Sequence, residues 1–249
     1  VVMQGKLGKR SFVKNIFSLY GSQVSTIIAL IAMALILTIL TPRFLTGKNL
    51  ITVLLQSSIN SLLALGMTFI ILTANIDLSV GAVVAFSAAI PGYLMVNMGL
   101  NPVLAILLGL ALGTLTGFLN GLVITKVGIP AFIVTLGSMS IWRGLALQLT
   151  NGTTSFGLPD LIKVLGQGYV GPIPVPVIIM IVAYLIAWFI LTKTPLGLAT
   201  YAIGGNEQAS QLSGIKVDKV KIELFCLHGF LSGLGGLVLA GRLNSTMGV

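Results

Sequence analysis

The sequence carries very little charge, since only 8% of its 249 residues are Asp, Glu, Lys or Arg. A soluble domain usually carries about 25% charged residues. Hydrophobic residues make up 56% of the chain, and a chain so poor in charge could not cover the surface of a soluble protein of this size. Lipid is therefore expected to be its main solvent.

Residues that build catalytic and metal sites are also scarce. The single cysteine, Cys226, excludes a disulfide framework and a cysteine-based metal site. The five carboxylates are too scattered for paired acid/base catalysis. The one histidine, His228, follows Glu223 by five positions, which does not place the two on one helical face. A zinc site would need more ligands than lie nearby, so we expect no bound metal.

Nucleotide chemistry and nucleic-acid binding are not indicated either. The chain has no nucleophile elbow, no HExxH and no Walker lysine loop, and "GGNEQASQLSG" lacks the GK[ST] ending. We therefore expect a chain that is not an enzyme and binds no cofactor. The net charge of +9 is better explained by membrane topology than by a DNA-binding face, because the basic residues lie mostly in connections.

Long apolar runs predict an all-α, polytopic membrane helix bundle with about seven spans. The third run contains Pro91 and Gly92, so we expect it to be kinked or broken. The connection Asn151–Pro174 is rich in turn signals, with room for a short helix near Leu161–Leu165. The seven predicted spans are Val24–Leu40, Leu50–Thr73, Val80–Met98, Val103–Thr125, Ala131–Thr150, Val175–Thr192 and Ile222–Ala240.

The basic residues favour an N-terminus inside the cell, with residues 1–21 as a cytoplasmic segment. Alternating seven spans from that start gives nine basic residues inside and four outside, with Arg143 left within a span. The inside residues are Lys6, Lys9, Arg10, Lys14, Lys126, Lys193, Lys216, Lys219 and Lys221, and the outside ones are Arg43, Lys48, Lys163 and Arg242. The loop 193–219 is then cytoplasmic.

Small residues recur at helical spacing in two of the predicted spans. The fourth span has glycines at every fourth position, and the seventh has a similar set. Such spacing lets helix backbones approach closely, which indicates one packed bundle without implying any chemistry. The glycines are Gly109, Gly113 and Gly117 in the fourth span and Gly229, Gly233 and Gly236 in the seventh.

Asp77, in "TANIDLSVG", is the clearest ionisable group among the apolar runs. Its carboxylate could bind a cation, relay protons or hydrogen-bond a polar solute. The alternative is structural, with Asp77 or Ser79 as the N-cap of the third span. His228 fits a helix–helix hydrogen bond or a pathway role, whereas no partner can be named for Arg143.

The polar stretch "YAIGGNEQASQLSGIKVDKVK", residues 201–221, predicts a short capped helix. Gly204 and Gly205 are expected to form a flexible turn. Asn206 is a good N-cap, Glu207 places negative charge in the first turn, and Gly214 is a good stop. A helix of Glu207–Ser213 is marginal alone in water. It could dock a soluble partner or lie on anionic lipid, and the residues alone do not decide between these.

Three segments resemble bacterial sugar ABC importer permeases of the ribose/galactose/xylose type. They are "ANIDLSVGAVVAFSA", "NGLVITKVGIPAFIVTLGSMSIWRGLALQLTNG" and "GLATYAIGGNEQASQLSGIKVDKVKIELFCLHGFLSGLGGLVLAGRLNS". Their order and spacing agree with that family over most of the chain after about Leu50. One departure is "ANIDLS", where many relatives have a glycine pair and this chain has Asn75.

The resemblance implies a single permease domain over residues 1–249, in the bacterial inner membrane. It implies a homodimer, a cytoplasmic ATPase that hydrolyses the ATP and a periplasmic sugar-binding protein. Relatives usually continue with further spans, which implies a shortened chain here. The helix after Asn206 resembles a coupling helix, with Gly204, Gly205, Asn206, Glu207, Ala209, Ser210, Ser213 and Gly214 as the coupling residues. Asn75, Asp77 and Asn120 are the pathway candidates.

Two other function classes stay open at this point. An ion-gradient-driven secondary transporter would use Asp77 as its ion or proton site. A membrane-embedded enzyme is disfavoured because no catalytic constellation is visible. The sequence does not identify the sugar.

Overall fold

A computed structural model describes residues 25–246. The chain divides into two compact units, residues 1–53 and 54–249, and each is described by itself. The expected cytoplasmic segment 1–21 lies outside the described residues. In the first unit, the described part of the first predicted span is an apolar helix, Ser25–Leu40. It extends about 24 Å, less than the ~30 Å hydrocarbon core of a bilayer.

Six helices in the described part of the chain are long and apolar enough to cross a membrane. The span count is therefore about six, not seven, because helix Ser25–Leu40 is too short in its described part. The other predicted spans each match a helix, so the all-α polytopic bundle is confirmed. The helices are α2 (Gly47–Leu72), α3 (Val80–Met98), α4 (Pro102–Leu122), α5 (Ala131–Leu149), α7 (Val175–Lys193) and α10 (Val217–Leu243), and α4 continues as the π-helix η1 (Val123–Val127).

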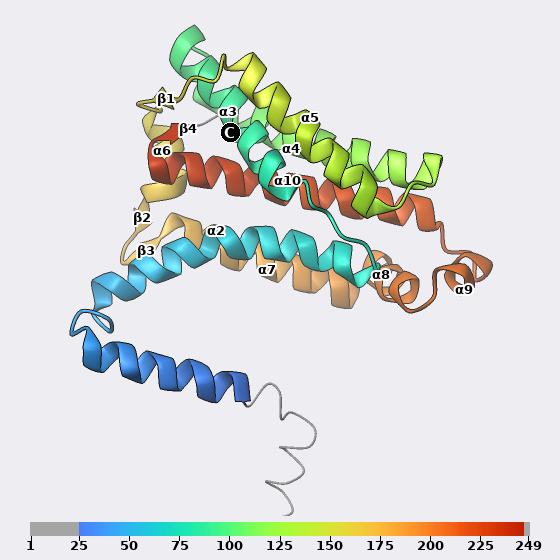
Figure 1. Cartoon of the computed structure of the whole chain (residues 1–249), viewed down its shortest axis with the longest axis horizontal. Helices are drawn as coiled ribbons and strands as arrows, with labels where there is room; N and C mark the ends of the chain where they lie inside the picture. Colours follow the sequence, from blue (N-terminus) through green and yellow to red (C-terminus); the bar gives the residue numbers. More distant parts are fainter. Residues whose placement is uncertain (1–24, 247–249) are drawn as a thin grey trace, which may run out of the picture. The chain divides into compact units, whose positions relative to one another are not determined.

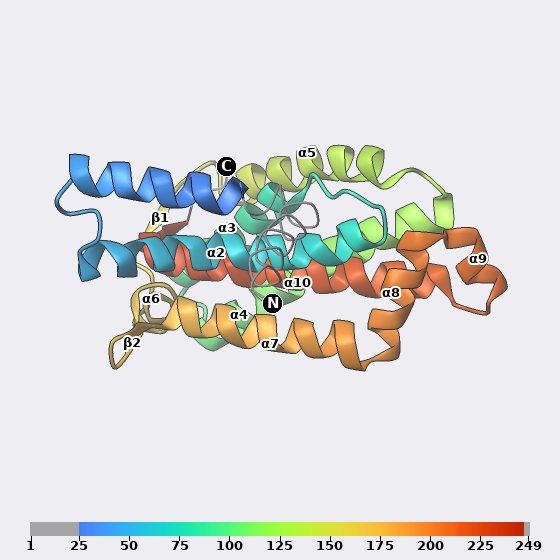
Figure 2. The same cartoon turned by 90° about the horizontal axis from the view of Figure 1, so that it is seen from below.

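Helix α10 runs through the second unit with α3, α4 and α5 on one side and α2 and α7 on the other (Figure 1, Figure 2). It packs most extensively on α4, where facing glycines let the backbones meet. A β-carbon on Gly113 would meet the carbonyl oxygen of Gly229, and one on Gly229 would meet that of Gly113. The close approach predicted from the glycine spacing is confirmed.

At one end of the bundle, the long connection after α5 packs on the end of α10. It contains the predicted short helix, observed as α6 (Asp160–Gln167), and three two-residue strands, β1 (Ser155–Phe156), β2 (Tyr169–Val170) and β3 (Ile173–Pro174). Strand β1 pairs antiparallel with β4 (Ser245–Thr246), and β2 pairs with β3. Gln167 Nε2 donates to the carbonyls of Gly241 and Arg242, at 3.1 and 3.0 Å.

At the opposite end, α7 leads into two short helices, α8 (Pro195–Gly205) and α9 (Glu207–Leu212), before α10 begins. The apolar side chains of α8 pack into a core shared with α2 and α10. Ile203, Phe69 and Phe225 are fully buried there. This packing fixes α8 beside the spans, so the polar stretch of the sequence is attached to the bundle rather than hanging free.

The third span is one continuous helix, and the non-helical residues lie before it, between α2 and α3. Helix α3 is continuous through Pro91, so of the expected kink or break the break is wrong. A single proline removes only one backbone hydrogen bond, which a surrounded membrane helix tolerates. The non-helical residues are instead 73–79, between α2 and α3. Because Asp77 lies against His228 and Val84 against Gly236, α3 starts partway along α10.

Candidate functional site

A buried polar cluster lies at the start of α3, inside the bundle. Asp77 Oδ1 accepts hydrogen bonds from the Ser79 backbone N–H at 2.7 Å and from the Ser79 hydroxyl at 2.5 Å. Asn120, from α4, donates from Nδ2 to Ser79 Oγ at 3.1 Å. All three side chains are buried. Ser79 therefore joins the two predicted pathway residues, Asp77 and Asn120, into one network.

His228 faces this network from α10. Its Nε2 lies 3.7 Å from Asp77 Oδ2, and each residue is only 2% exposed. Within residues 25–246, neither ring nitrogen of His228 has a hydrogen-bond partner. An imidazole that is fully buried and without a close partner is costly for stability alone. Its position beside a buried carboxylate marks the pair as a functional candidate.

Helix α5 supplies one hydrogen-bond partner to the non-helical backbone of this segment. Thr135 Oγ1 accepts a hydrogen bond from the Leu78 N–H at 3.1 Å and itself donates to the Ala131 carbonyl at 2.8 Å. Irregular backbone at membrane depth persists only where protein buries it or where it lines a wet cavity.

Asn75 has hydrogen-bond partners other than the Asp77–Ser79–Asn120 network. Its side-chain amide donates to the carbonyl and the hydroxyl of Thr73, at 2.8 and 3.1 Å. It lines a separate pocket of about 290 Å³, together with Glu207 and Lys221. The alternative of Asp77 or Ser79 as the N-cap of α3 can now be judged. Ser79 is the N-cap residue, but its side chain makes no capping hydrogen bond. Asp77 instead makes a structural hydrogen bond to Ser79.

The predicted short helix is present as α9, with the predicted chemistry at its start. Asn206 Oδ1 accepts from the Ala209 N–H at 2.9 Å, and the Ser210 hydroxyl donates to the Asn206 carbonyl at 2.8 Å. The helix ends at Leu212, one residue before the predicted end. Gly214 follows with a φ of +87°, which a side chain would strain. The predicted N-cap and stop are thus confirmed.

The expectation of a flexible turn at Gly204 and Gly205 is wrong. Both residues lie in the last turn of α8, and the chain turns at Asn206 instead. Gly204 is needed for a close approach, because a β-carbon there would collide with the Leu72 carbonyl oxygen at the end of α2. Gly205 has open space around it. Sequence reasoning missed α8, although Thr194 and Pro195 form a helix start, with Thr194 Oγ1 accepting from the Gly197 N–H at 3.3 Å.

Ion pairs attach α9 and its neighbours to the base of α10. Lys221 Nζ lies 2.7 Å from both carboxylate oxygens of Glu207, and the lysine side chain is only 11% exposed. A second pair, Lys126 with Asp218 at 2.8 Å, is exposed on both sides. The outer face of α9 is open, with Leu212 at 90% exposure. This is an apolar side chain presented at the charged end of the bundle.

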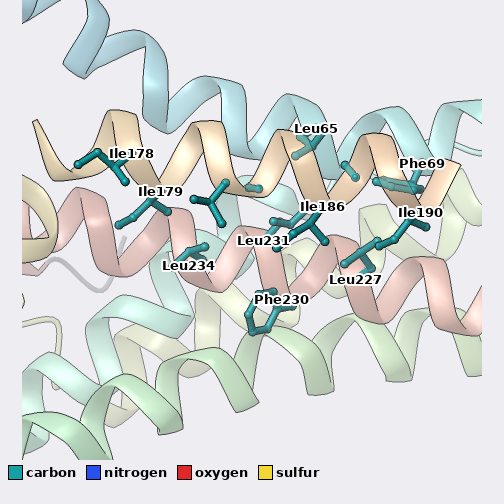
Figure 3. A pocket seen from close by; sticks show the side chains of 13 residues that line it. Leu65, Phe69, Ile178, Ile179, Ile186, Ile190, Leu227, Phe230, Leu231 and Leu234 are labelled. Atoms are coloured by element: carbon teal, nitrogen blue, oxygen red, sulfur yellow. The ribbon is translucent and has the colours of Figure 1, made fainter. Parts of the chain in front are cut away.

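A second, apolar pocket of about 280 Å³ lies between α2, α7 and α10 (Figure 3). Its lining side chains have no polar atoms, so it offers no hydrogen bonds to a polar solute. The apolar lining of this pocket therefore contrasts with the hydrogen-bonding groups of the Asp77 cluster. The lining residues are Leu65, Phe69, Ile178, Ile179, Val182, Ala183, Ile186, Ala187, Ile190, Leu227, Phe230, Leu231 and Leu234.

The six long apolar helices surround the non-helical, polar segment 73–79. This combination defines a multi-pass membrane protein with the architecture of a transporter. The family described as "Branched-chain amino acid transport system / permease component" matches residues 49–247. The chain belongs to this family of transport permeases, as its sequence motifs predicted.

Several relatives are known by name. The chain is 46% identical to the ribose import permease protein RbsC of Bacillus subtilis over 220 residues, which is 88% of this chain and 68% of the relative. It is 39% identical to the Escherichia coli K12 ribose import permease over 242 residues, 96% of this chain and 74% of the relative. The D-allose transport system permease protein AlsC of the same strain is 36% identical over 92% of this chain and 71% of its own length. No solved structure matches the chain.

Proposed function

We propose that this chain is the permease subunit of an ATP-driven importer for a monosaccharide, ribose or a related sugar. The observation that carries the proposal is the 46% identity to a ribose import permease over 88% of the chain. The buried polar cluster supports it, because sugars are recognised through hydrogen bonds and the rest of the bundle is apolar. In this account the chain is not an enzyme and holds no cofactor, since ATP is hydrolysed by a partner subunit.

The pathway is proposed to run past Asp77 and Asn120, with Asn75 nearer its α9 end. Carboxylate and amide oxygens accept hydrogen bonds from sugar hydroxyls, and amide N–H groups donate to them. Asp77 and Asn120 share Ser79 as a partner. The hydroxyl groups of a passing sugar can therefore replace the hydrogen bonds that Asp77 and Asn120 make to Ser79. Contacts of this kind are weak enough to allow release.

Helix α9 is proposed to be the coupling element that the ATPase contacts. Its outer face is open and presents Leu212 beside polar neighbours. The coupling set is the one predicted from the sequence, with Gly204 acting through its contact with Leu72 and Gly214 through its left-handed backbone. Closure of an ATPase dimer would move α9, and the bundle would switch between two packed arrangements.

The α9 end is proposed to face the cytoplasm. The N-terminus is proposed to lie on the same side, which requires the first predicted span, Val24–Leu40, to cross the membrane in addition to the six long helices of the described residues. Basic residues concentrate at the α9 end, as the positive-inside rule requires of a cytoplasmic face. Within the second unit they are Lys126, Lys193, Lys216, Lys219 and Lys221, against Lys163 and Arg242 at the other end. The remaining partners are proposed from the family: a second copy of the permease, a periplasmic sugar-binding protein and the inner-membrane lipid.

Co-purification with the cognate ATPase subunit tests the coupling part of the proposal. We expect Glu207→Lys and Gly205→Pro to weaken the association, since both alter the α9 entry, while membrane insertion stays intact. Asp160→Lys is the matched control, because it makes the same charge change at the opposite end of the bundle. Equal recovery of the ATPase with all three variants and the wild type would contradict the proposal.

A further inference from the structure

Helix α10 connects the two parts of the site without interruption. It is helical from Val217 to Leu243, and four residues separate its start from the end of α9. Lys221 lies in its first turns and His228 about 10 Å further along the axis. One rigid element therefore carries a contact to α9 and a contact to the buried polar cluster.

The contact to α9 is the Glu207–Lys221 ion pair. Both carboxylate oxygens lie 2.7 Å from Lys221 Nζ. The lysine is 11% exposed, whereas the lysines of the Lys126–Asp218 and Lys219–Glu223 pairs are 60% and 71% exposed. Burial lowers screening by water and holds the side chain in one geometry. Of these pairs, only this one holds the first residue of α9 to α10.

The contact to the cluster is the Asp77–His228 pair. Asp77 is already hydrogen-bonded to Ser79, so a shift of His228 acts on the start of α3. Gly66 of α2 lies against the imidazole on another side, which leaves the ring little room to turn away. The titratable residues of α10 nearest to His228 in the sequence are Cys226 and Glu223, and Asp77 comes from the non-helical segment before α3.

The α4–α10 interface makes the connection stiff. Backbone meets backbone at Gly113, Gly117 and Gly229, so the two helices can shift only together. Asn120 lies on α4 and bonds Ser79, so α4 reaches the same polar cluster by a second route. Motion of α10 would then act on Ser79 through Asp77 and, by way of α4, through Asn120.

We propose that Lys221 and His228 are positioning residues that make α10 the lever between the ATPase contact and the sugar pathway. Lys221 fixes α9 to the lever and His228 fixes the lever to Asp77. This inference rests on the proposed function, because it assigns the means by which ATP-driven motion of α9 reaches the pathway.

The test is the ratio of ATP hydrolysed to sugar transported, measured on the assembled importer with its ATPase and binding protein in proteoliposomes and radiolabelled ribose as the probe. Glu207→Lys and Lys221→Glu are each expected to raise the ratio about fivefold or more, the lower end of typical coupling between sites. The double variant, with the charges exchanged, is expected to restore it. The exchanged pair Asp160→Lys with Lys163→Asp is the control and is expected to leave the ratio unchanged.

A second set of variants tests the other end of the lever. His228→Leu is expected to raise the same ratio. His228→Gln is expected to keep part of the coupling, because its side-chain amide places an N–H donor on the side that faces the Asp77 carboxylate. A purely structural role would instead lower the yield of assembled importer and leave the ratio unchanged. If the exchanged Glu207/Lys221 pair stays uncoupled, or if His228→Leu keeps the wild-type ratio, the lever is wrong. If the wild-type chain does not assemble with the ATPase at all, the proposed function itself is wrong.

Discussion

Gly66 and His228 lie so close that a β-carbon built on Gly66 would be 2.6 Å from Nδ1 of the imidazole. The contact joins α2 to α10 and holds the ring toward Asp77. Gly66→Ala should therefore displace the imidazole. Overpacking of this kind costs about 1–3 kcal/mol.

We expect Gly66→Ala to reduce ribose uptake several-fold in reconstituted importer while the chain still inserts into the membrane. Gly137→Ala, on α5, is the control, because nothing in the described structure lies within 4 Å of an added β-carbon there. Wild-type uptake by Gly66→Ala would show that the position of His228 does not matter.

The glycine contacts of α4 and α10 predict a stability effect. A β-carbon on Gly117 would collide with the Phe225 carbonyl oxygen, which cannot move without shifting α10. Gly117→Ala should lower the free energy of unfolding by about 1–3 kcal/mol. Thermal unfolding in detergent measures this. Gly144→Ala, which has open space in the described structure, should unfold like the wild type or later.

The N-cap of α9 predicts a defect in partner binding. Asn206→Ala removes the acceptor of the Ala209 N–H, at a cost of about 1 kcal/mol to a helix of one and a half turns. We expect weaker ATPase association, read by co-purification. Asn101→Ala removes the same kind of cap from α4 at the opposite end and should leave association intact. If Asn206→Ala and Asn101→Ala change ATPase association equally, the prediction that α9 contacts the ATPase is contradicted.

The Asp77 carboxylate predicts a transport defect with assembly preserved. Asp77→Asn keeps one oxygen that can accept from Ser79 but removes the charge that faces His228. Sugar uptake should fall at least about tenfold, the effect of ~1.4 kcal/mol on the barrier, while the ATPase still binds. Asp160→Asn, whose side chain is 96% exposed, is the control. If Asp77→Asn takes up sugar as fast as Asp160→Asn, Asp77 is not a pathway residue.

The features that sequence reasoning predicted well depend on neighbouring residues. Asn206, Glu207 and Gly214 define α9 by capping chemistry within nine residues, and the structure agrees to one residue at its end. The glycine spacing of the fourth and seventh spans predicted close helix packing in one bundle, because every fourth residue falls on one face. That these two spans pack on each other is known only from the structure. Hydropathy found the spans because lipid demands an apolar run of fixed length.

The features it missed depend on contacts between distant segments. Gly204 and Gly205 appear as a turn in sequence, but Gly204 is helical because it packs on Leu72. Pro91 suggested a kink or a break in α3, whereas the non-helical residues precede α3, where Thr135 of α5 accepts from the Leu78 N–H. His228 was expected to make a helix–helix hydrogen bond or to have a pathway role, but neither ring nitrogen has a hydrogen-bond partner within residues 25–246. Its place beside Asp77 follows from the packing of α10 on the start of α3, which no local pattern encodes.

The most direct test of the whole account is ribose uptake into proteoliposomes that hold this chain, with and without its ATPase and binding protein. The account predicts uptake only with both partners and ATP on the α9 side, and none with the chain alone under a proton or sodium gradient. Gradient-driven uptake by the chain alone would contradict the account, because Asp77 would then serve an ion-coupled transporter.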